Sequence, residues 1–227
     1  MNFQTMKQLP LDLKLADYAV FDSFLAGSNG LVLNAVQQAA VEPGQQVIWL
    51  WGPTGSGRSH LMQAAIAAAA DQGAVCAWLP LADQSLVPGM LAGMGELDLL
   101  CVDDVDLIAG DADWERALFG VFEDLRHHSG RLLLTASAPT NEVKFGLPDL
   151  ASRFASGATW KLQSLTDDEL LAALQLRSSW RGLELSAETG QFLLRRVSRS
   201  TASLFALLDE LDHEAMAEKR RLTVPFV

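Results

Sequence analysis

The sequence predicts an α/β domain built as three αβα layers around a parallel β-sheet, followed by a small helical lid domain. Short apolar runs alternate with helical patterns through residues 18–163, as in α/β folds. A glycine-rich loop joins one of these runs to a helix, and only helical patterns follow residue 165. Residues 1–17 mix polar residues with one short apolar run and predict an extended tail. The expected division is therefore a tail at 1–17, an α/β domain at 18–163 and a lid at 164–227.

The expected strands and helices of the first domain follow from apolar periodicity. The run at 97–102 is continuously apolar, which is typical of a central parallel strand. Apolar residues that recur three and four positions apart indicate helices that begin near residues 31, 59 and 114. A weaker helical pattern at 85–94 is interrupted by Pro88-Gly89. The expected strands are 47–51, 74–79, 97–102, 131–135 and 158–162.

The C-terminal part predicts three helices, at 167–180, 187–198 and 201–220. Thr166 and Ser186 stand at the N-cap positions of the first two, where a hydroxyl oxygen accepts a hydrogen bond from a backbone N–H. The third helix carries an apolar stripe that predicts packing against the other two. The residues of this stripe are Leu204, Leu207, Leu208, Leu211 and Ala215.

Charge and composition exclude several classes of protein. The 227 residues carry a formal net charge of −11, and without a basic stripe we expect no autonomous DNA binding. The apolar runs are too short or too interrupted for a membrane span, and the N-terminus lacks a signal-peptide pattern. Cys76 and Cys101 lie in apolar runs, which predicts two buried thiols in a reduced, cytoplasmic protein.

A glycine-rich loop with the spacing of a P-loop lies between the strand at 47–51 and the following helix. Its residues are Gly52, Pro53, Thr54, Gly55, Ser56, Gly57, Arg58 and Ser59. Glycines let successive backbone N–H groups converge on phosphate oxygens, and the helix N-terminus adds positive charge. We therefore predict that this loop binds ADP or ATP with Mg²⁺, with Ser59 as a metal ligand and His60 beside the phosphates. Arg58 stands where such loops usually have Lys. The replacement keeps the positive charge, but the two side chains are not interchangeable, so the prediction of efficient hydrolysis is weaker than that of nucleotide binding.

Two carboxylates follow the apolar run at 97–102. Asp103 is expected to hold Mg²⁺ through water, and Asp104 to orient an attacking water molecule. Acidic residues often end strands, so this pair alone would be weak evidence. Its position about 45 residues beyond a P-loop makes the assignment much stronger.

These residues resemble the AAA+ ATPases, and among them the DnaA family of replication initiators. The segment 21–29, with Phe21 in its first turn, is similar to the one that helps to form the adenine pocket in that family. The segment 150–154 is similar to the one that carries the arginine finger, which assigns this catalytic role to Arg153. Ser137 follows the strand at 131–135, where the family's sensor I group lies beside the γ-phosphate. The resemblance covers roughly residues 18–221.

Two departures from the initiators narrow the resemblance to the Hda family of DnaA-related regulators. The helix-turn-helix domain of the initiators is missing after the lid, and the tail at 8–13 looks like a sliding-clamp-binding peptide. In an extended tail Leu11 and Leu13 point the same way, with Gln8 as a hydrogen-bonding anchor. The usual peptide has a small polar residue at position 10 and Pro at 12, where this chain has Pro and Asp. The resemblance implies DnaA and the sliding clamp as partners, and leaves self-association open.

The lid departs from the family at one further position. Ala202 stands where the resemblance places a sensor II arginine, and Arg199 lies three residues earlier. Loss of that arginine would weaken phosphate sensing by this chain without impairing Arg153.

The leading hypothesis is a regulator of replication initiation. It binds nucleotide, docks on the clamp and uses Arg153 to promote ATP hydrolysis on DnaA, while its own ATPase activity is weak. The alternative is an autonomous AAA+ ATPase or helicase loader that acts on nucleic acid, which predicts self-assembly and turnover lost on Asp104→Asn. A P-loop small-molecule kinase would need an acceptor-binding insertion, and the sequence shows no evident one.

Overall fold

A five-stranded parallel sheet forms the centre of the computed structural model, which describes residues 19–42, 46–196 and 201–218. The strand order is β2-β3-β4-β1-β5, and every neighbouring pair is parallel. The predicted three-layer α/β fold is confirmed. The strands are β1 (Val47–Trp51), β2 (Cys76–Pro80), β3 (Leu99–Asp103), β4 (Arg131–Ala136) and β5 (Ala158–Lys161).

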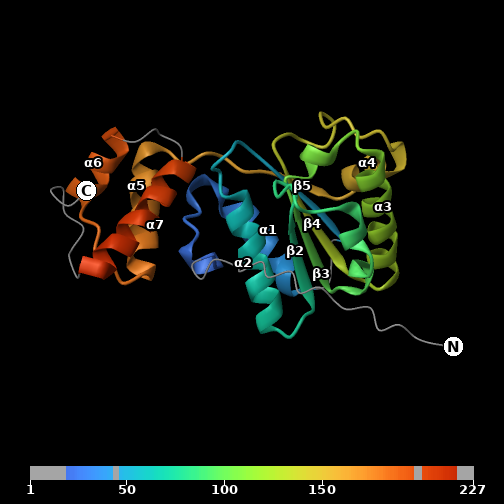
Figure 1. The fold of residues 1–227 in the computed structure, drawn as a ribbon, viewed down its shortest axis with the longest axis horizontal. Helices are drawn as coiled ribbons and strands as arrows, with labels where there is room; N and C mark the ends of the chain where they lie inside the picture. Colours follow the sequence, from blue (N-terminus) through green and yellow to red (C-terminus); the bar gives the residue numbers. More distant parts are fainter. Residues whose placement is uncertain (1–18, 43–45, 197–200, 219–227) are drawn as a thin grey trace.

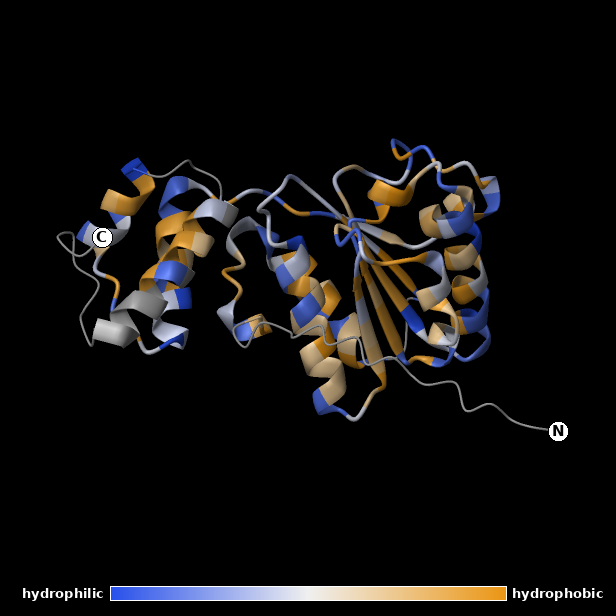
Figure 2. Cartoon of the chain, in the orientation of Figure 1, coloured by the Kyte–Doolittle hydropathy of each residue, from blue (hydrophilic) through white to orange (hydrophobic). Residues whose placement is uncertain are grey.

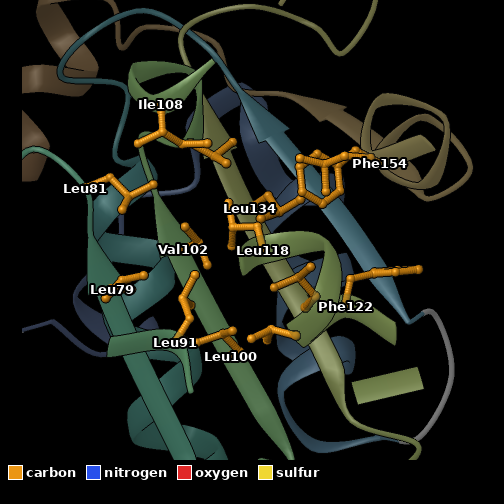
Figure 3. Close-up of a cluster of buried hydrophobic side chains, with 14 of the residues drawn as sticks. Leu79, Leu81, Leu91, Leu100, Val102, Ile108, Leu118, Phe122, Leu134 and Phe154 are labelled. Carbon is orange, nitrogen blue, oxygen red and sulfur yellow. The ribbon is translucent and has the colours of Figure 1, made fainter. Parts of the chain in front are cut away.

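Helices cover both faces of this sheet (Figure 1). On one face lie α1 (Gly30–Val41) and α2 (Arg58–Asp71); on the other lie α3 (Ala112–His127) and α4 (Pro148–Ala155). The strands are almost uniformly apolar because both faces are buried, as Figure 2 shows. The side chains of α3 and α4 meet those of the sheet in the core cluster drawn in Figure 3, which includes Leu100, Leu118, Phe122, Leu134 and Phe154.

Two segments differ from the sequence-based expectation. The weak helical pattern at 85–94 forms two short 3₁₀ turns, η3 (Pro88–Leu91) and η4 (Met94–Glu96), because Gly93 takes a left-handed conformation between them. The sequence-based reading also contained no helix at 148–155, where α4 begins with Pro148 in its first turn.

The expectation of two buried thiols is correct for only one cysteine. Cys101 lies in the centre of the sheet and is fully buried, and burial raises the pKa of its thiol well above the usual value. Cys76 is half-buried, because β2 is an edge strand of the sheet.

Three helices follow the sheet, as predicted: α5 (Asp167–Trp180), α6 (Ala187–Arg196) and α7 (Thr201–Glu218). The Thr166 hydroxyl accepts a hydrogen bond from Glu169 N at 3.3 Å, and the Glu169 carboxylate accepts one from Thr166 N at 2.8 Å. The Ser186 hydroxyl caps α6 by accepting from Thr189 N at 3.1 Å. The helices bury their own apolar cluster, made of Leu170, Leu174, Leu185, Leu193, Leu204, Leu208 and Leu211. None of the helices in the described part of the chain is long and apolar enough to cross a membrane.

A buried amide fastens the connection between the sheet and the lid. Asn29, which is 2% exposed, ends the short turn η2 (Gly27–Asn29) ahead of α1. Its side chain accepts a hydrogen bond from Gln163 N at 2.7 Å and donates one to Gln163 O at 3.1 Å. The connecting segment 162–166 is therefore held beside the N-terminal turns of the first domain.

A buried carboxylate on α3 holds two loops in place. Glu115 is 1% exposed, and its oxygens accept hydrogen bonds from Gly110 N at 2.6 Å, Gly146 N at 2.9 Å and Leu147 N at 2.6 Å. Leu147 is the N-cap residue of α4. One side chain therefore positions the loop after β3 and the start of α4 together.

Replacing Glu115 by Ala should destabilise the fold by about 3 kcal/mol, because three backbone N–H groups lose a buried, charged acceptor. Urea denaturation measures this change in the free energy of unfolding. The control is Asp113→Ala on the same helix, which removes an exposed ion pair with Arg116 and should cost less than about 1 kcal/mol. Equal costs for the two variants would contradict this role of Glu115.

Candidate functional site

A cavity of about 350 Å³ lies at the carboxyl end of β1, between the P-loop and the lid. Three parts of the chain form its wall. The first domain contributes Thr54, Gly55, Ser56, Gly57, Arg58, Ser59, His60, Gln63 and Asp104. The N-terminal segment contributes Ala19, Ser23, Phe24 and Leu25, and the lid side contributes Leu165, Ala173, Arg177, Thr201 and Phe205.

The glycines of the P-loop bring these three parts close together. Gly57 is the N-cap of α2 and has a φ of 95°, and a Cβ atom there would lie 2.6 Å from a ring carbon of Phe24. Gly55 has a φ of 81°, and a Cβ atom there would lie 3.0 Å from the Cβ of Thr201 at the start of α7. Both positions therefore need glycine for conformation and for space.

Arg58 forms an ion pair with Asp104 on the wall of the cavity. Its Nη2 lies 3.0 Å from Asp104 Oδ1, and the two side chains are 11% and 29% exposed. Burial raises the pKa of the Asp104 carboxyl, the neighbouring Asp103 raises it further, and the Arg58 charge acts in the opposite direction. Asp104 itself has a left-handed backbone with a φ of 54°, directly after β3.

Two further polar atoms of the P-loop suit a phosphate group. Arg58 Nη1 and Ser56 Oγ are buried and have no hydrogen-bond partner among the described residues. A buried donor without a partner is costly, and a phosphate oxygen would satisfy it. The loop that the sequence assigns to phosphate binding therefore has the donors that an anion requires.

Asp103 lies behind the cavity wall, in the sheet. It is 3% exposed and accepts a hydrogen bond from the Thr135 hydroxyl, which in turn accepts one from Asp104 N at 2.8 Å. Ser137, the residue assigned to sensor I, is exposed, and its N–H and hydroxyl both donate to Asp106. Thr135 is thus the hydroxyl of β4 that contacts the acidic pair, and the sequence-based reading missed it.

The residues present fit a metal ion only together with a nucleotide. The described residues contain no group of three or more His, Cys, Asp or Glu side chains that would hold a metal. Ser59 lines the cavity, with Asp104 on the same wall and Asp103 behind it. Mg²⁺ in P-loop sites takes few protein ligands and completes its shell with phosphates and water, so this donor set suits a magnesium nucleotide.

His60 connects the P-loop helix to the N-terminal segment. Its Nε2 lies 3.0 Å from Val20 O and 3.3 Å from Ser23 Oγ, and its ring meets that of Phe24 edge-on. Burial lowers the pKa of His60, and the Arg177 charge lowers it further against the opposing effect of the Val20 hydrogen bond. The structure places Phe24 on the cavity wall, whereas Phe21, assigned to nucleotide binding, packs against the core cluster beneath α1 and α2.

Arg177 of α5 is a second cavity residue that the sequence-based reading missed. It is 8% exposed, and its guanidinium carbon lies 4.6 Å from the centre of the Phe205 ring on α7. The helical spacing could have predicted its burial, because Arg177 lies on the same side of α5 as the buried residues Leu170 and Leu174. Arg199, the arginine considered for this region from the sequence, lies outside the described residues.

Arg153 does not line this cavity. It lies on α4 with 45% of its side chain exposed, and its Nε is 3.3 Å from Glu123 Oε1 on α3. Its guanidinium also lies 6.0 Å from the centre of the Phe122 ring. The tail residues assigned to clamp binding, Gln8, Leu11 and Leu13, lie outside the described residues.

Comparisons with known proteins agree on the fold. A family model for the Hda lid domain matches residues 167–227. Domain III of the Thermotoga maritima initiator DnaA has a TM-score of 0.79 at 17% identity, over 94% of this chain and 95% of that one. AMPPCP-bound DnaA from Aquifex aeolicus has a TM-score of 0.73 at 21% identity, over 91% of this chain and 69% of that one. The Thermotoga maritima RuvB Holliday junction branch migration motor has a TM-score of 0.59 at 19% identity, over 89% and 65%.

Replacing Asp104 by Asn should tighten ADP binding without Mg²⁺ by about fivefold, because Arg58 loses a competing counter-ion and the phosphates lose a nearby negative charge. Isothermal titration calorimetry in EDTA measures the affinity. Asp106→Asn is the matched control, since Asp106 is near the same strand end but accepts its hydrogen bonds from Ser137. Weaker ADP binding by the Asp104 variant would contradict the competition.

Proposed function

We propose that this chain, which matches the Hda lid domain over residues 167–227 and resembles DnaA in its fold, is a nucleotide-bound regulator of replication initiation. In this proposal it acts with the DNA sliding clamp, stimulates ATP hydrolysis on DnaA and so inactivates the initiator. Arg153 supplies the catalytic charge, and the bound nucleotide keeps the regulator folded in its active form.

The position of Arg153 is the observation that carries this proposal. Its guanidinium is half exposed on α4, on the face of the sheet that α3 and α4 cover (Figure 1). The chain's own cavity is lined by α2, the N-terminal segment and the lid instead. An arginine outside its own site is suited to stabilise the charge that develops on the phosphates of a neighbouring molecule.

The surroundings of Arg153 keep it ready for this use. Glu123 pairs with Arg153 at 3.3 Å and with Arg126 at 2.6 Å, so one carboxylate orients two arginines. The Arg153 pair is longer and partly exposed, which makes it weak and easily exchanged for a phosphate. Glu115 fixes the N-cap of α4 and so limits how far the helix that carries Arg153 shifts.

The chain's own site supports ligand binding better than turnover. Asp104, the residue expected to orient water, is engaged by Arg58 at 3.0 Å. A carboxylate held by a guanidinium is a poorer hydrogen-bond acceptor for an attacking water molecule. We therefore propose a weak intrinsic ATPase activity, with ADP as the resident ligand and Mg²⁺ bound through Ser59 and, by way of water, Asp103. The magnesium ion would neutralise charge between the phosphates and these side chains.

Ligand binding would also stabilise the two-domain arrangement. The cavity wall combines the P-loop with residues of α5 and α7, so an occupant contacts both domains at once. A ligand that binds only the folded state raises its stability by mass action. In this proposal the bound nucleotide stabilises the fold and the domain arrangement, and its hydrolysis is not the source of energy for the function.

The clamp part of the proposal rests on the N-terminal tail. Leu11 and Leu13 alternate with Pro10 and Asp12, which places both leucines on one side of an extended peptide. Such a peptide inserts apolar side chains into a groove on its partner while the main chain stays extended. The clamp would thereby bring Arg153 to DnaA at high effective concentration.

The Arg153→Ala variant should lose the stimulation of ATP hydrolysis on DnaA by about 10³-fold, the lower end of the effect of an arginine finger. Phosphate release from DnaA–ATP, in the presence of clamp loaded on DNA, measures the rate. Arg126→Ala is the matched control because Arg126 shares the same carboxylate partner and should retain the stimulation within about twofold. Full stimulation by the Arg153 variant would show that the finger is elsewhere.

The Gln8→Ala variant and a Leu11→Ala, Leu13→Ala double variant should lose most clamp binding in a pull-down, because the peptide loses its anchor or its apolar contacts. Circular dichroism should report an unchanged fold. If these variants bind the clamp as well as the wild-type chain does, the tail is not the clamp-binding segment. The proposed role of Arg153 would then still depend on its own test.

A further inference from the structure

A single hydroxyl group lies in the apolar interior of β4. Thr135 has an exposed fraction of 0%, and the neighbouring positions 132–134 and 136 of the strand are apolar. Valine has nearly the same shape as threonine, and a buried hydroxyl costs free energy unless it is hydrogen-bonded. Packing of the sheet therefore does not account for a hydroxyl at this position.

The strand register places Thr135 beside both parts of the candidate site. Thr135 pairs with Leu50 of β1, near the end of the strand that leads into the P-loop. On the other side Leu134 pairs with Val102 of β3, so Thr135 and Asp103 follow at the next level. Side chains at one level of neighbouring parallel strands lie on the same face of the sheet. The register therefore brings the hydroxyl to the Asp103 carboxylate.

This one hydroxyl contacts both acidic residues. Its oxygen accepts a hydrogen bond from Asp104 N at 2.8 Å, and it donates its proton to Asp103 Oδ1. Because a backbone N–H can only donate, the hydroxyl proton is available to the carboxylate, and the hydroxyl has one favoured orientation. Among the described residues no other group donates a hydrogen bond to the Asp103 carboxylate, so its second oxygen is left for water.

The same hydroxyl supports an unusual backbone at Asp104. Asp104 has a φ of 54°, a left-handed conformation that residues other than glycine adopt rarely. From this position its carboxylate reaches Arg58 Nη2 at 3.0 Å. The hydrogen bond from Asp104 N to Thr135 is therefore made whether or not a ligand is bound, whereas the Asp103 carboxylate has an oxygen to offer to a ligand.

We propose that Thr135 is a positioning residue that makes nucleotide binding depend on magnesium. It holds one oxygen of Asp103, and so leaves the other in a fixed place for the water that links Asp103 to Mg²⁺. Thr135 acts through Asp103 and contacts neither the metal nor the nucleotide. This inference rests on the nucleotide and magnesium binding proposed above.

The test measures ADP binding by isothermal titration calorimetry, once with Mg²⁺ and once in EDTA. The ratio of the two affinities is the magnesium enhancement. Thr135→Val should reduce this enhancement by about tenfold, the lower end of the effect of losing a group that orients a metal ligand. Its ADP affinity in EDTA should stay within about threefold of the wild-type value, because Asp103 acts on the nucleotide only through the metal. Thr135→Ser keeps the hydroxyl and should keep the enhancement.

Two further variants separate positioning from packing. Thr189→Val is the matched control, since Thr189 is also buried, at 2% exposed, but lies on α6 and does not line the cavity. It should leave the enhancement within about twofold. In the background of Asp103→Asn, Thr135→Val should cause no further loss of enhancement, because the carboxylate that the hydroxyl orients is already absent.

Several results would overturn the inference. An unchanged enhancement in Thr135→Val would do so, and so would an equal loss of ADP affinity in both buffers, which would make Thr135 a support of the fold or of the P-loop. A further loss in the Asp103→Asn background would show that Thr135 acts elsewhere. If Thr135→Val does not fold, Thr135→Cys takes its place, because a thiol is a weaker donor, and an unchanged enhancement there would contradict the proposal.

Failure of the proposed function gives a different result. A wild-type chain that does not bind ADP would reject the nucleotide site. A wild-type chain that binds ADP equally with Mg²⁺ and in EDTA would reject the magnesium site, and the positioning role of Thr135 with it.

Discussion

The parallel register of the three central strands determines where every group of the site lies. Trp51 of β1 pairs with Ala136 of β4, and Gly52 N continues the pairing by donating to Ala136 O at 3.3 Å. The strand order places β4 between β1 and β3, so Thr135 reaches Asp103 on one side while the P-loop leaves the sheet on the other. A shift of β4 by one residue would turn Thr135 to the opposite face. The sheet therefore aligns the P-loop with the acidic pair.

The same arrangement places the cavity and Arg153 in different parts of the molecule. The cavity faces α2 and the lid, where Arg58 and Asp104 neutralise one another. Arg153 lies on α4, held lightly by Glu123 and positioned by Glu115. The close ion pair of Asp104 and the longer, partly exposed ion pair of Arg153 fit the proposal that the protein holds one nucleotide and acts on another. The two sites share a scaffold, yet each is supported by its own set of contacts.

The sequence predicts the parts of this structure that depend on local pattern. The strands, the P-loop and the lid helices follow from apolar periodicity, glycine spacing and the caps at Thr166 and Ser186, all of which are encoded within a few residues. Thr135 contacts Asp103 and Ser137 does not, and Phe24 lines the cavity and Phe21 does not, because of the way each side chain points after folding. Arg177 was missed because it joins the cavity wall only when the lid packs beside the P-loop. The short helix α4 was missed because its apolar residues Leu150 and Phe154 form too brief a pattern.

In the proposed mechanism this chain retains its own nucleotide while it promotes hydrolysis of another. The most direct test labels the two nucleotides separately. In one reaction, this chain is loaded with ATP labelled at the γ-phosphate and is mixed with clamp on DNA and with DnaA that carries unlabelled ATP. In a second reaction, DnaA carries the labelled ATP and this chain carries the unlabelled ATP. We expect rapid release of the label carried by DnaA and retention of the label carried by this chain. Rapid release from this chain, with the label on DnaA retained, would contradict it.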